Sequence, residues 1–457
     1  MLARIFGSIR YMSYLNNRRQ FIQRAGSASL AFTILKAGSA RTYAANEKLN
    51  IASVGAGGQA AGDIRNLSSE NIIGLADVDW QRAAGSFRKY SKAKQFKDYR
   101  KMFDEMGSGI DAVIVGTPDH HHFHATLAAI RMGKAVYTEK PLTHSVWEAR
   151  ELTKAARKAG VVTQMGNQAQ ASEETRVVQE FVMDNAAGQI REAHIWTDRP
   201  SKGLFGEYWP QGIGKPAEIE KVPDTLDWNL WLGPAPERGY NSVYCPRTWR
   251  GWWDFGTGAL GDIACHFFDP VFRALKLGAP SSVEATSSRA NDQSFPLASM
   301  ITYLFPKRGD MAPLKLVWYD GGLRPARHRM VDEGAVMGTN GLMLVGDDGV
   351  LLSDWKHWRL YPEKRGQEYG RPPKKLKRSP GHHQEFIIAA KGGVKAGSNF
   401  DWAGPLTETV LLGNVALRAE LREDLTKKKL LWNGKKMQFT NHPEANAFLR
   451  REYRTGW

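Results

Sequence analysis

A glycine-rich turn after a short apolar run is the feature that most constrains how this chain can fold. Residues 49–62 read LNIASVGAGGQAAG: the apolar run ends at Gly55, Gly57 and Gly58 follow, and Ala60 comes two positions later. A strand that ends in glycines and opens a helix lets backbone N–H groups approach a diphosphate, whose charge the helix N-terminus favours. The pattern G-x-G-G-x-A is a variant of the dinucleotide-binding fingerprint. It predicts a nucleotide site, and a closely packed turn without a ligand is the alternative.

An acidic residue stands at the spacing that this fingerprint requires. Residues 71–76 read as the next strand, and Asp77 follows 22 positions after Gly55. An acidic side chain about 20 residues after the first glycine binds the adenosine ribose in such sites. Asp77 favours NAD over NADP because its carboxylate would repel a 2′-phosphate, although the nearby Arg82 weakens that preference. We therefore expect NAD as the cofactor, with NADP as the alternative.

Strand-like and helix-like runs alternate up to residue 166. Short apolar runs are followed by amphipathic stretches, whose apolar positions recur every three or four residues. Such alternation predicts an α/β fold with a doubly wound parallel sheet, in which ligands bind at the carboxyl ends of the strands. The expected strands are 49–54, 71–76, 110–115, 135–138 and 161–165, and the expected helices are 80–90, 99–106, 122–132 and 146–159.

Beyond residue 166 the alternation ends. A helix-like and a strand-like run precede a stretch rich in Trp, Pro and Gly, and the later strand-like runs have no helices between them, which predicts a mostly antiparallel sheet. We expect a nucleotide-binding domain over 46–166 and an α+β domain with a mostly antiparallel open sheet over 167–457. The expected elements there are a helix at 173–185, strands at 191–197, 282–286, 299–305, 314–318, 342–345 and 358–361, and helices at 383–390 and 406–418, the last starting close to Pro405.

The first 45 residues have the form of an export signal. They hold seven basic residues and no acidic ones, with the pair Arg18-Arg19 before a mildly apolar stretch and small residues up to Ala45. The apolar stretch is too short to span a bilayer. This pattern predicts a twin-arginine-type signal peptide over 1–45, or a chance arginine pair in a basic leader. We expect export to the periplasm by the twin-arginine machinery, membrane association if the leader is retained, and a tightly held cofactor because that route carries folded proteins.

Charge and cysteine content exclude other classes of function. The formal net charge is +16, but basic residues outside the leader are spread out, and the runs at 374–378 and 427–429 are typical of solvated loops. We therefore expect no nucleic-acid partner. The two cysteines, Cys245 and Cys265, form neither a disulfide framework nor a C-x-x-C metal motif.

The loops after the predicted strands carry further motifs: GTPDHHH at 116–122, EKP at 139–141 and GNQ at 166–168. Together with the glycine turn they resemble the Gfo/Idh/MocA family (glucose–fructose oxidoreductase, inositol dehydrogenase and rhizopine catabolism proteins). The matching segments, in order, are VGAGGQAAG, ADVD, VIVGTPDHHH, YTEKPL, GALGDIACHFFD and NFDWAGPLTETVLLGNVALR, and they cover most of residues 49–420.

The resemblance implies a Rossmann domain that binds a nicotinamide cofactor, a carbohydrate substrate, and a C-terminal sheet that forms a homodimer or homotetramer. It places Lys140 beside the nicotinamide, before a Lys–Pro bond that is often cis. The cofactor-binding residues implied by the fingerprint and the resemblance are Gly55, Gly57, Gly58, Ala60, Asp77, Thr117, Pro118, His120, Glu139, Lys140 and Asn167.

Hydride transfer from a carbinol needs a base for the hydroxyl proton and positive charge near the developing alkoxide. Asp262 and His266 are four residues apart, so on a helix they would share one face. The resemblance makes both catalytic, with His266 as the base and Lys140 stabilising the oxygen. Arg250 and Trp252 come just before this motif, and we expect them to bind the substrate with Lys140 and His266, unless the tryptophans of this stretch are core residues.

The run of histidines at 120–122, with His124, suggests a metal at first sight. No carboxylate or cysteine completes an obvious ligand set, and the family has Asp-His-x-His here without a metal, so we expect no metal site. His120 and His122 are expected to line the cofactor crevice or to pack at the helix start. His121 occupies a position that is often Trp in relatives, which would change the edge of the pocket.

The sequence therefore predicts an exported NAD(P)-dependent oxidoreductase that oxidises a secondary hydroxyl of a sugar, sugar derivative or polyol. Two alternatives remain open. One is a glycosidase or lyase that retains NAD, oxidises its substrate transiently and eliminates a group. The other is a sugar-binding protein in which NAD is only structural.

Overall fold

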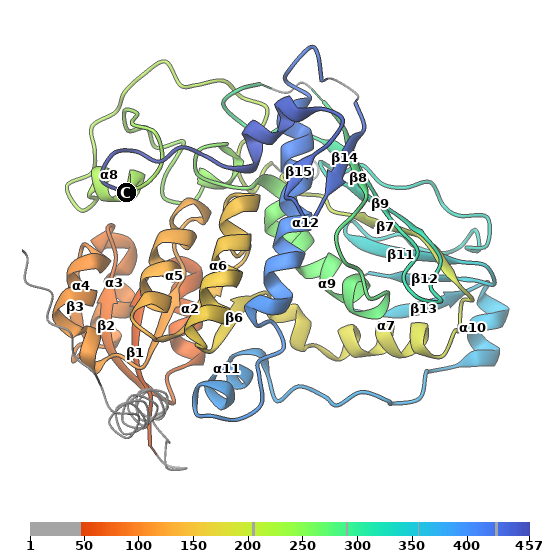
Figure 1. The fold of residues 1–457 in the computed structure, drawn as a ribbon, viewed down its shortest axis with the longest axis horizontal. Helices are drawn as coiled ribbons and strands as arrows, with labels where there is room; N and C mark the ends of the chain where they lie inside the picture. The colour runs from red at the N-terminus through yellow and green to blue at the C-terminus, as the bar shows by residue number, and fades with distance from the viewer. Residues whose placement is uncertain (1–46, 203–205, 289–290, 355, 426–427) are drawn as a thin grey trace, which may run out of the picture. The chain divides into compact units, whose positions relative to one another are not determined.

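The computed structural model describes residues 47–202, 206–288, 291–354, 356–425 and 428–457 (Figure 1). The predicted signal peptide over 1–45 lies outside the described residues. Residues 48–457 form one compact unit. Within the described ranges, none of the helices combines the length and the apolar character that crossing a membrane would require.

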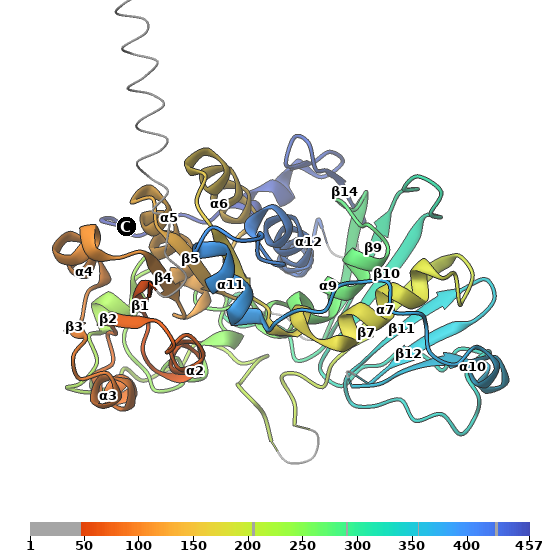
Figure 2. The ribbon, with the colours of Figure 1, turned by 90° about the horizontal axis from the view of Figure 1, so that it is seen from below.

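The first sheet is parallel and doubly wound, as the sequence predicts. Its strand order is β3-β2-β1-β4-β5-β6, so the order reverses between β1 and β4. Helices α2 and α3 lie on one face of this sheet and α5 and α6 on the other (Figure 2). The strands are β1 (Asn50–Val54), β2 (Asn71–Ala76), β3 (Lys94–Phe96), β4 (Ala112–Val115), β5 (Ala135–Glu139) and β6 (Thr163–Gly166); the helices are α2 (Gly58–Asn66), α3 (Trp80–Lys89), α4 (Tyr99–Met106), α5 (His122–Arg131) and α6 (Val146–Ala159).

The second sheet has the order β13-β12-β11-β7-β10-β9-β8-β14-β15. Strands β7 and β10 pair in parallel, and the other neighbours are antiparallel, which confirms the mostly antiparallel sheet. Its strands are β7 (Ile190–Trp196), β8 (Ser282–Ser287), β9 (Ser299–Phe305), β10 (Leu314–Tyr319), β11 (Gly341–Gly346), β12 (Val350–Ser353), β13 (Trp358–Tyr361), β14 (Leu430–Asn433) and β15 (Gln438–Phe439). The helices of this half are α7 (Glu173–Met183), α8 (Trp228–Leu232), α9 (Cys265–Ala274), α10 (Glu363–Tyr369), α11 (His382–Ala390) and α12 (Phe400–Ala419).

Helix α12 begins earlier than the sequence predicts. Pro405 does not start this helix but lies inside it, and the helix starts at Phe400. The side chain of Asn399 caps it by accepting a hydrogen bond from the backbone N–H of Asp401. Pro405 removes one backbone hydrogen bond, toward the carbonyl of Asp401, and a proline inside a helix costs about 3 kcal/mol or more. Burial along most of the helix offsets this cost.

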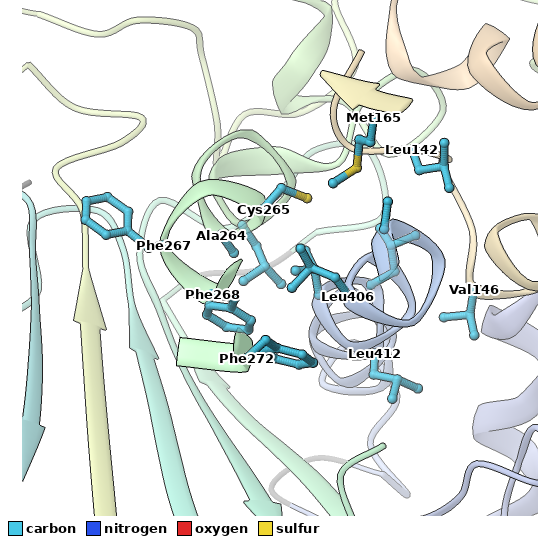
Figure 3. Close-up of a cluster of buried hydrophobic side chains, with 14 of the residues drawn as sticks. Leu142, Val146, Met165, Ala264, Cys265, Phe267, Phe268, Phe272, Leu406 and Leu412 are labelled. Atoms are coloured by element: carbon cyan, nitrogen blue, oxygen red, sulfur yellow. The ribbon is translucent and has the colours of Figure 1, made fainter. Parts of the chain in front are cut away.

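Helices α9 and α12 join the two sheets (Figure 3). Leu406 of α12 packs in a buried cluster with Met165 of β6 and with Cys265 and Phe268 of α9. Figure 3 shows these side chains pointing toward one another, whereas Phe267 points away, toward the second sheet. One continuous core therefore fixes the start of α9 against the parallel sheet, and Asp262 lies in the turn just before α9.

Candidate active site

The glycine turn has the geometry that a dinucleotide needs. Gly55 has φ +92°, and a Cβ atom there would lie 2.9 Å from the carbonyl oxygen of Gly116. At Gly57 a Cβ atom would lie 2.6 Å from Cγ of Arg82. Helix α2 starts at Gly58 with no side-chain cap and no acidic residue in its first turn. The first backbone N–H groups of this helix therefore have no side-chain cap and lie near the guanidinium of Arg82, an arrangement that fits a diphosphate.

Asp77 fixes the turn from the neighbouring strand. Its Oδ2 accepts hydrogen bonds from the backbone N–H groups of Ala56 (2.8 Å) and Gly57 (3.1 Å), and its Oδ1 accepts one from Asp79 (2.9 Å). Burial raises the pKa of this carboxyl, and those hydrogen bonds oppose the rise. Asp77 also lines a cavity that lies next to the turn, at the end of β2 where the sequence predicts contact with a ribose.

A cavity of about 380 Å³ runs along the carboxyl ends of the parallel strands. It crosses the point between β1 and β4 where the strand order reverses, which is where ligands bind in such sheets. Nine of the residues that the sequence predicts for the site line it: Gly55, Gly57, Asp77, Thr117, Pro118, Glu139, Lys140, Arg250 and Asp262.

Four charged side chains form a chain of ion pairs at one end of this cavity. Lys140 Nζ lies 2.7 Å from Asp262 Oδ1 and donates to the Asp262 backbone carbonyl at 2.8 Å. Arg250 lies between two carboxylates, 3.2 Å from Asp262 and 3.3 Å from Asp119. Burial disfavours the charge on Asp262, but Lys140 and Arg250 outweigh burial and hold the pKa of this carboxyl well below its usual range. Asp262 is therefore ionised and orients both cations.

The local backbone contributes to this arrangement. The Lys140–Pro141 peptide bond is cis, as the resemblance implies. Asp262 lies in a π-helical turn, Leu260–Ala264, before the α-helical part starts at Cys265. Single π turns inside helices frequently occur at functional sites.

His266 does not line the same cavity. It lines a second cavity of about 270 Å³ with Glu174, Lys356 and Trp358, between α7, α9 and the second sheet. Burial and then the charge of Lys140 lower the pKa of His266 to about 3, so its imidazole is neutral at pH 7. The shared helix face that the sequence predicts does not bring the two side chains into one cavity. Asp262, in the π turn, lines the nucleotide cavity, and His266, in the α-helical part, lines the neighbouring one.

Five other predicted residues do not line this cavity, and their contacts with cofactor or substrate remain predictions. Gly58 lines a neighbouring depression beside Arg82. Ala60 is fully buried, and a Cβ atom on Gly116 would come within 2.6 Å of the Ala60 Cβ, so its small size serves helix–strand packing. His120, Asn167 and Trp252 are fully buried: His120 faces the carbonyl of Trp231 at 2.9 Å, Asn167 donates to Cys265, and Trp252 Nε1 donates to Val243.

The ring nitrogens of the histidine run lie within hydrogen-bond distance of backbone carbonyl oxygens. The ring of His121 faces the Trp231 carbonyl at 2.8 Å, and the ring of His122 faces the carbonyls of Pro141 and Thr117. His121 rather than His120 lines the cavity. Among the described residues, no three His, Cys, Asp or Glu side chains are grouped as a metal ion would need. The absence of a metal remains a prediction.

A second buried cluster adjoins the cavity at Glu139. Its Oε1 accepts a hydrogen bond from Gln168 at 2.6 Å, and the neighbouring Asp63 lies 2.9 Å from the ring of His383. Burial raises the pKa of Asp63 to about 7, and burial together with the charge of Asp63 raises that of Glu139 well above its usual value. This pair of carboxyl groups therefore holds a proton at neutral pH.

Several residues of the cavity wall were not predicted from the sequence. Asp119 is fully buried and accepts a hydrogen bond from Thr257 at 2.5 Å; its place in the GTPDHHH motif was the available signal. Trp249 lines the cavity where Trp252 was expected, and its ring lies 4.3 Å from the Arg250 guanidinium. Trp457 also lines the cavity, and no pattern in the sequence pointed to it.

Comparisons with known proteins agree with this geometry. Residues 49–167 match the Gfo/Idh/MocA model described as an oxidoreductase family with an NAD-binding Rossmann fold, and residues 206–307 match the model of its C-terminal alpha/beta domain. The chain is 37% identical over 135 residues to 1,5-anhydro-D-fructose reductase of Ensifer adhaerens, which covers 30% of this chain and 40% of that protein. It is 40% identical over 103 residues to scyllo-inositol 2-dehydrogenase (NAD(+)) of Bacillus subtilis, which covers 22% of this chain and 30% of that protein.

Solved structures share the fold. The WlbA dehydrogenase of Bordetella pertussis, in complex with NADH and UDP-GlcNAcA, aligns with a TM-score of 0.56 at 14% identity over 85% of this chain and 99% of that one. The aldose-aldose oxidoreductase of Caulobacter crescentus, in complex with glycerol, aligns with a TM-score of 0.54 at 16% identity over 84% of this chain and 100% of that one.

The chain belongs to the Gfo/Idh/MocA family of oxidoreductases, with an NAD-binding Rossmann domain and the family's C-terminal domain. The regions that match cover 40% of the length of the first curated relative described above and 30% of the second.

Replacing Asp77 by Asn tests the cofactor preference. Asn is close in size and keeps an oxygen for the Ala56 and Gly57 amides, but it removes the charge that repels a 2′-phosphate. We expect the ratio of NADP to NAD affinity to rise by roughly tenfold, which corresponds to about 1.4 kcal/mol. Titration calorimetry with both nucleotides measures it, and Asp104→Asn, an exposed change on α4, is the control. An unchanged ratio would contradict the role of Asp77.

Proposed function

We propose that this protein is an NAD(P)-dependent oxidoreductase that oxidises a secondary hydroxyl of a sugar, sugar derivative or polyol. The observation that carries the proposal is that one cavity joins a glycine turn suited to a diphosphate with the Lys140–Asp262 ion pair at 2.7 Å. The curated relatives support the substrate class, since the two described above are named for an anhydrosugar and an inositol.

The residues of the chain divide the work along the cavity. Gly55, Gly57 and the start of α2 hold the diphosphate, and Asp77 binds the adenosine ribose. A nicotinamide bound beyond them would supply the hydride acceptor. Lys140 donates a hydrogen bond to the reacting oxygen and stabilises the negative charge that develops there. Asp262 holds the Lys140 ammonium in position and is itself held by Arg250.

His266 remains our candidate for the base, and the resemblance supports it more than the geometry does. Its neutral imidazole can accept a proton, and it interacts electrostatically with Lys140, Asp262 and Arg250. It opens on the neighbouring cavity, so the reacting hydroxyl has to reach from the nucleotide cavity toward α9. Arg250 lies between Asp119 and Asp262, within reach of the same substrate, and we propose it as a further substrate ligand.

Replacing Lys140 by Met tests the proposed chemistry. Met fills similar volume without the charge, so we expect kcat to fall by roughly 100-fold or more while the Kd for NAD changes little. The assay follows NADH absorbance with a panel of sugars and polyols, and Lys158→Met, an exposed change on α6, is the control. Net NADH formation by the unaltered protein supports a dehydrogenase. Product without net NADH would point to transient oxidation with elimination, and bound NAD with no turnover would point to a sugar-binding protein.

Replacing His266 by Ala tests whether this residue acts as the base without contributing to cofactor binding. We expect this variant to bind NAD normally and to lose oxidation, with His442→Ala as the control. Because the folded pKa of His266 is lowered to about 3, the basic form persists down to about pH 4. The kcat/KM profile should therefore show no acidic limb from this group between pH 5 and 8. Full turnover by the variant would remove His266 from the base role.

We also propose that the protein is exported to the periplasm with its nucleotide already bound, and that it forms a homodimer or homotetramer through the second sheet. Arg18-Arg19 in the basic leader supports export. Replacing both arginines by Lys should retain the protein in the cytoplasm, as cell fractionation would reveal. Export of the variant in which Arg18 and Arg19 are both replaced by Lys would argue against the twin-arginine route.

Mass spectrometry of nucleotide released from purified protein measures cofactor retention, and light scattering measures the size of the oligomer.

A further inference from the structure

The segment 450–457 crosses from α12 to the nucleotide cavity and ends with Trp457 in its wall. Trp457 lines the cavity together with Asp77, Tyr99 and His121. Figures 1 and 2 both show this dark-blue end of the described chain running past α6 and α5 toward α4. Neither the glycine fingerprint nor the family motifs include any residue of this segment.

Trp457 connects the two sides of the crevice at its adenosine end. Its ring lies 4.3 Å from the guanidinium of Arg100, in the first turn of α4, and 5.5 Å, edge on, from the ring of His121, in the turn before α5. The loops after β1, β2 and β3 form the half of such a sheet that binds the adenosine, and Asp77 lies there. Trp457 therefore borders the half of the crevice that the loops after β1, β2 and β3 form.

Several side-chain hydrogen bonds hold the segment in place. Arg451 Nε donates to Glu148 Oε1 at 2.9 Å, and the Tyr453 hydroxyl donates to the same oxygen at 2.8 Å. Glu148 is fully buried, and burial of its charge is offset by Arg451, which keeps its pKa below the usual value. Arg454 donates to the carbonyl of Gly233 at 3.0 Å and to the side chain of Asn229 at 2.8 Å. A segment attached this firmly can present a ring in one fixed place.

We propose that Trp457 is a cofactor-binding residue that stacks on or against the adenine, so that the segment 450–457 clamps the adenosine half of the bound dinucleotide. This inference rests on the proposed function, since it requires a dinucleotide in the cavity. An aromatic face binds any base through its π surface, and the guanidinium of Arg100 over the indole ring helps to hold that ring in place. The clamp would slow release of the nucleotide and so favour its retention.

The test compares ligands that contain different halves of the dinucleotide. Titration calorimetry gives the Kd of NAD, ADP-ribose and nicotinamide mononucleotide for the unaltered full chain and for Trp457→Ala. We expect the variant to bind NAD and ADP-ribose roughly tenfold more weakly, because base stacking of this kind is worth about that factor. Binding of nicotinamide mononucleotide should be unchanged, and NADH should dissociate faster by a similar factor.

Two further variants make the result specific. Trp457→Phe retains an aromatic face and should recover most of the affinity. Arg450→Ala removes the stacking of Arg450 on Trp147 (4.2 Å), in the same segment but away from the cavity, and should leave all three Kd values unchanged. Equal weakening for all three ligands, or the same loss in Arg450→Ala, would show that the segment matters only for stability.

Two outcomes separate the failure of this inference from the failure of the proposed function. If the unaltered protein binds NAD and Trp457→Ala binds it equally well or more tightly, the clamp is wrong while the proposed function stands; tighter binding would mean that the indole occupies the adenine position. If the unaltered protein binds neither NAD nor NADP, the proposed function fails and the clamp with it.

Discussion

The ionised carboxylate of Asp262 is the group on which the rest of the site depends. It lies in a π turn of the C-terminal half, yet its partner Lys140 comes from the end of β5 and its other partner Arg250 from the loop that follows α8. Burying an unpaired charge costs several kcal/mol, so each cation is needed to keep this carboxylate charged. The same ion pairs that make the charge tolerable also hold an ammonium group beside the nucleotide cavity.

The neighbouring carboxyl groups behave in the opposite way because burial outweighs the groups that favour their charge, including Lys140 beside Glu139. Glu139 and Asp63 share a buried region with amide and imidazole groups, and burial raises the pKa of both. The cavity is therefore bordered by the ionised carboxylate of Asp262 and by Glu139, which shares a proton with the Asp63 carboxyl behind it. Environments that separate the pKa values of nearby carboxyl groups are typical of sites that carry out acid–base chemistry.

Local periodicity made the first sheet predictable, because each strand is an apolar run and each helix has an apolar stripe. Strand β3 was missed since it has three residues and little burial. The start of α12 was misplaced at Pro405 because tertiary burial outweighed the proline. The motifs indicated which loops meet at the cavity, but not the directions of side chains. Trp249 lines the cavity and Trp252 does not, and the same holds for His121 and His120, because the local turn of the backbone decides which side chain points inward. Trp457 is held at the cavity by residues far away in the sequence, such as Arg100.

Helix α12 has a consequence for motion. It lies between α6 and strands β8 and β9 (Figures 1 and 2). The Thr153 hydroxyl donates a hydrogen bond to the backbone carbonyl of Phe400 at one end of α12, and the Tyr303 hydroxyl donates one to the carbonyl of Val410 further along. Bending the two sheets apart about a hinge would break buried contacts on both sides of this helix. Closing or opening the crevice about such a hinge would therefore carry the cost of these contacts, whereas small displacements of its loop walls would not.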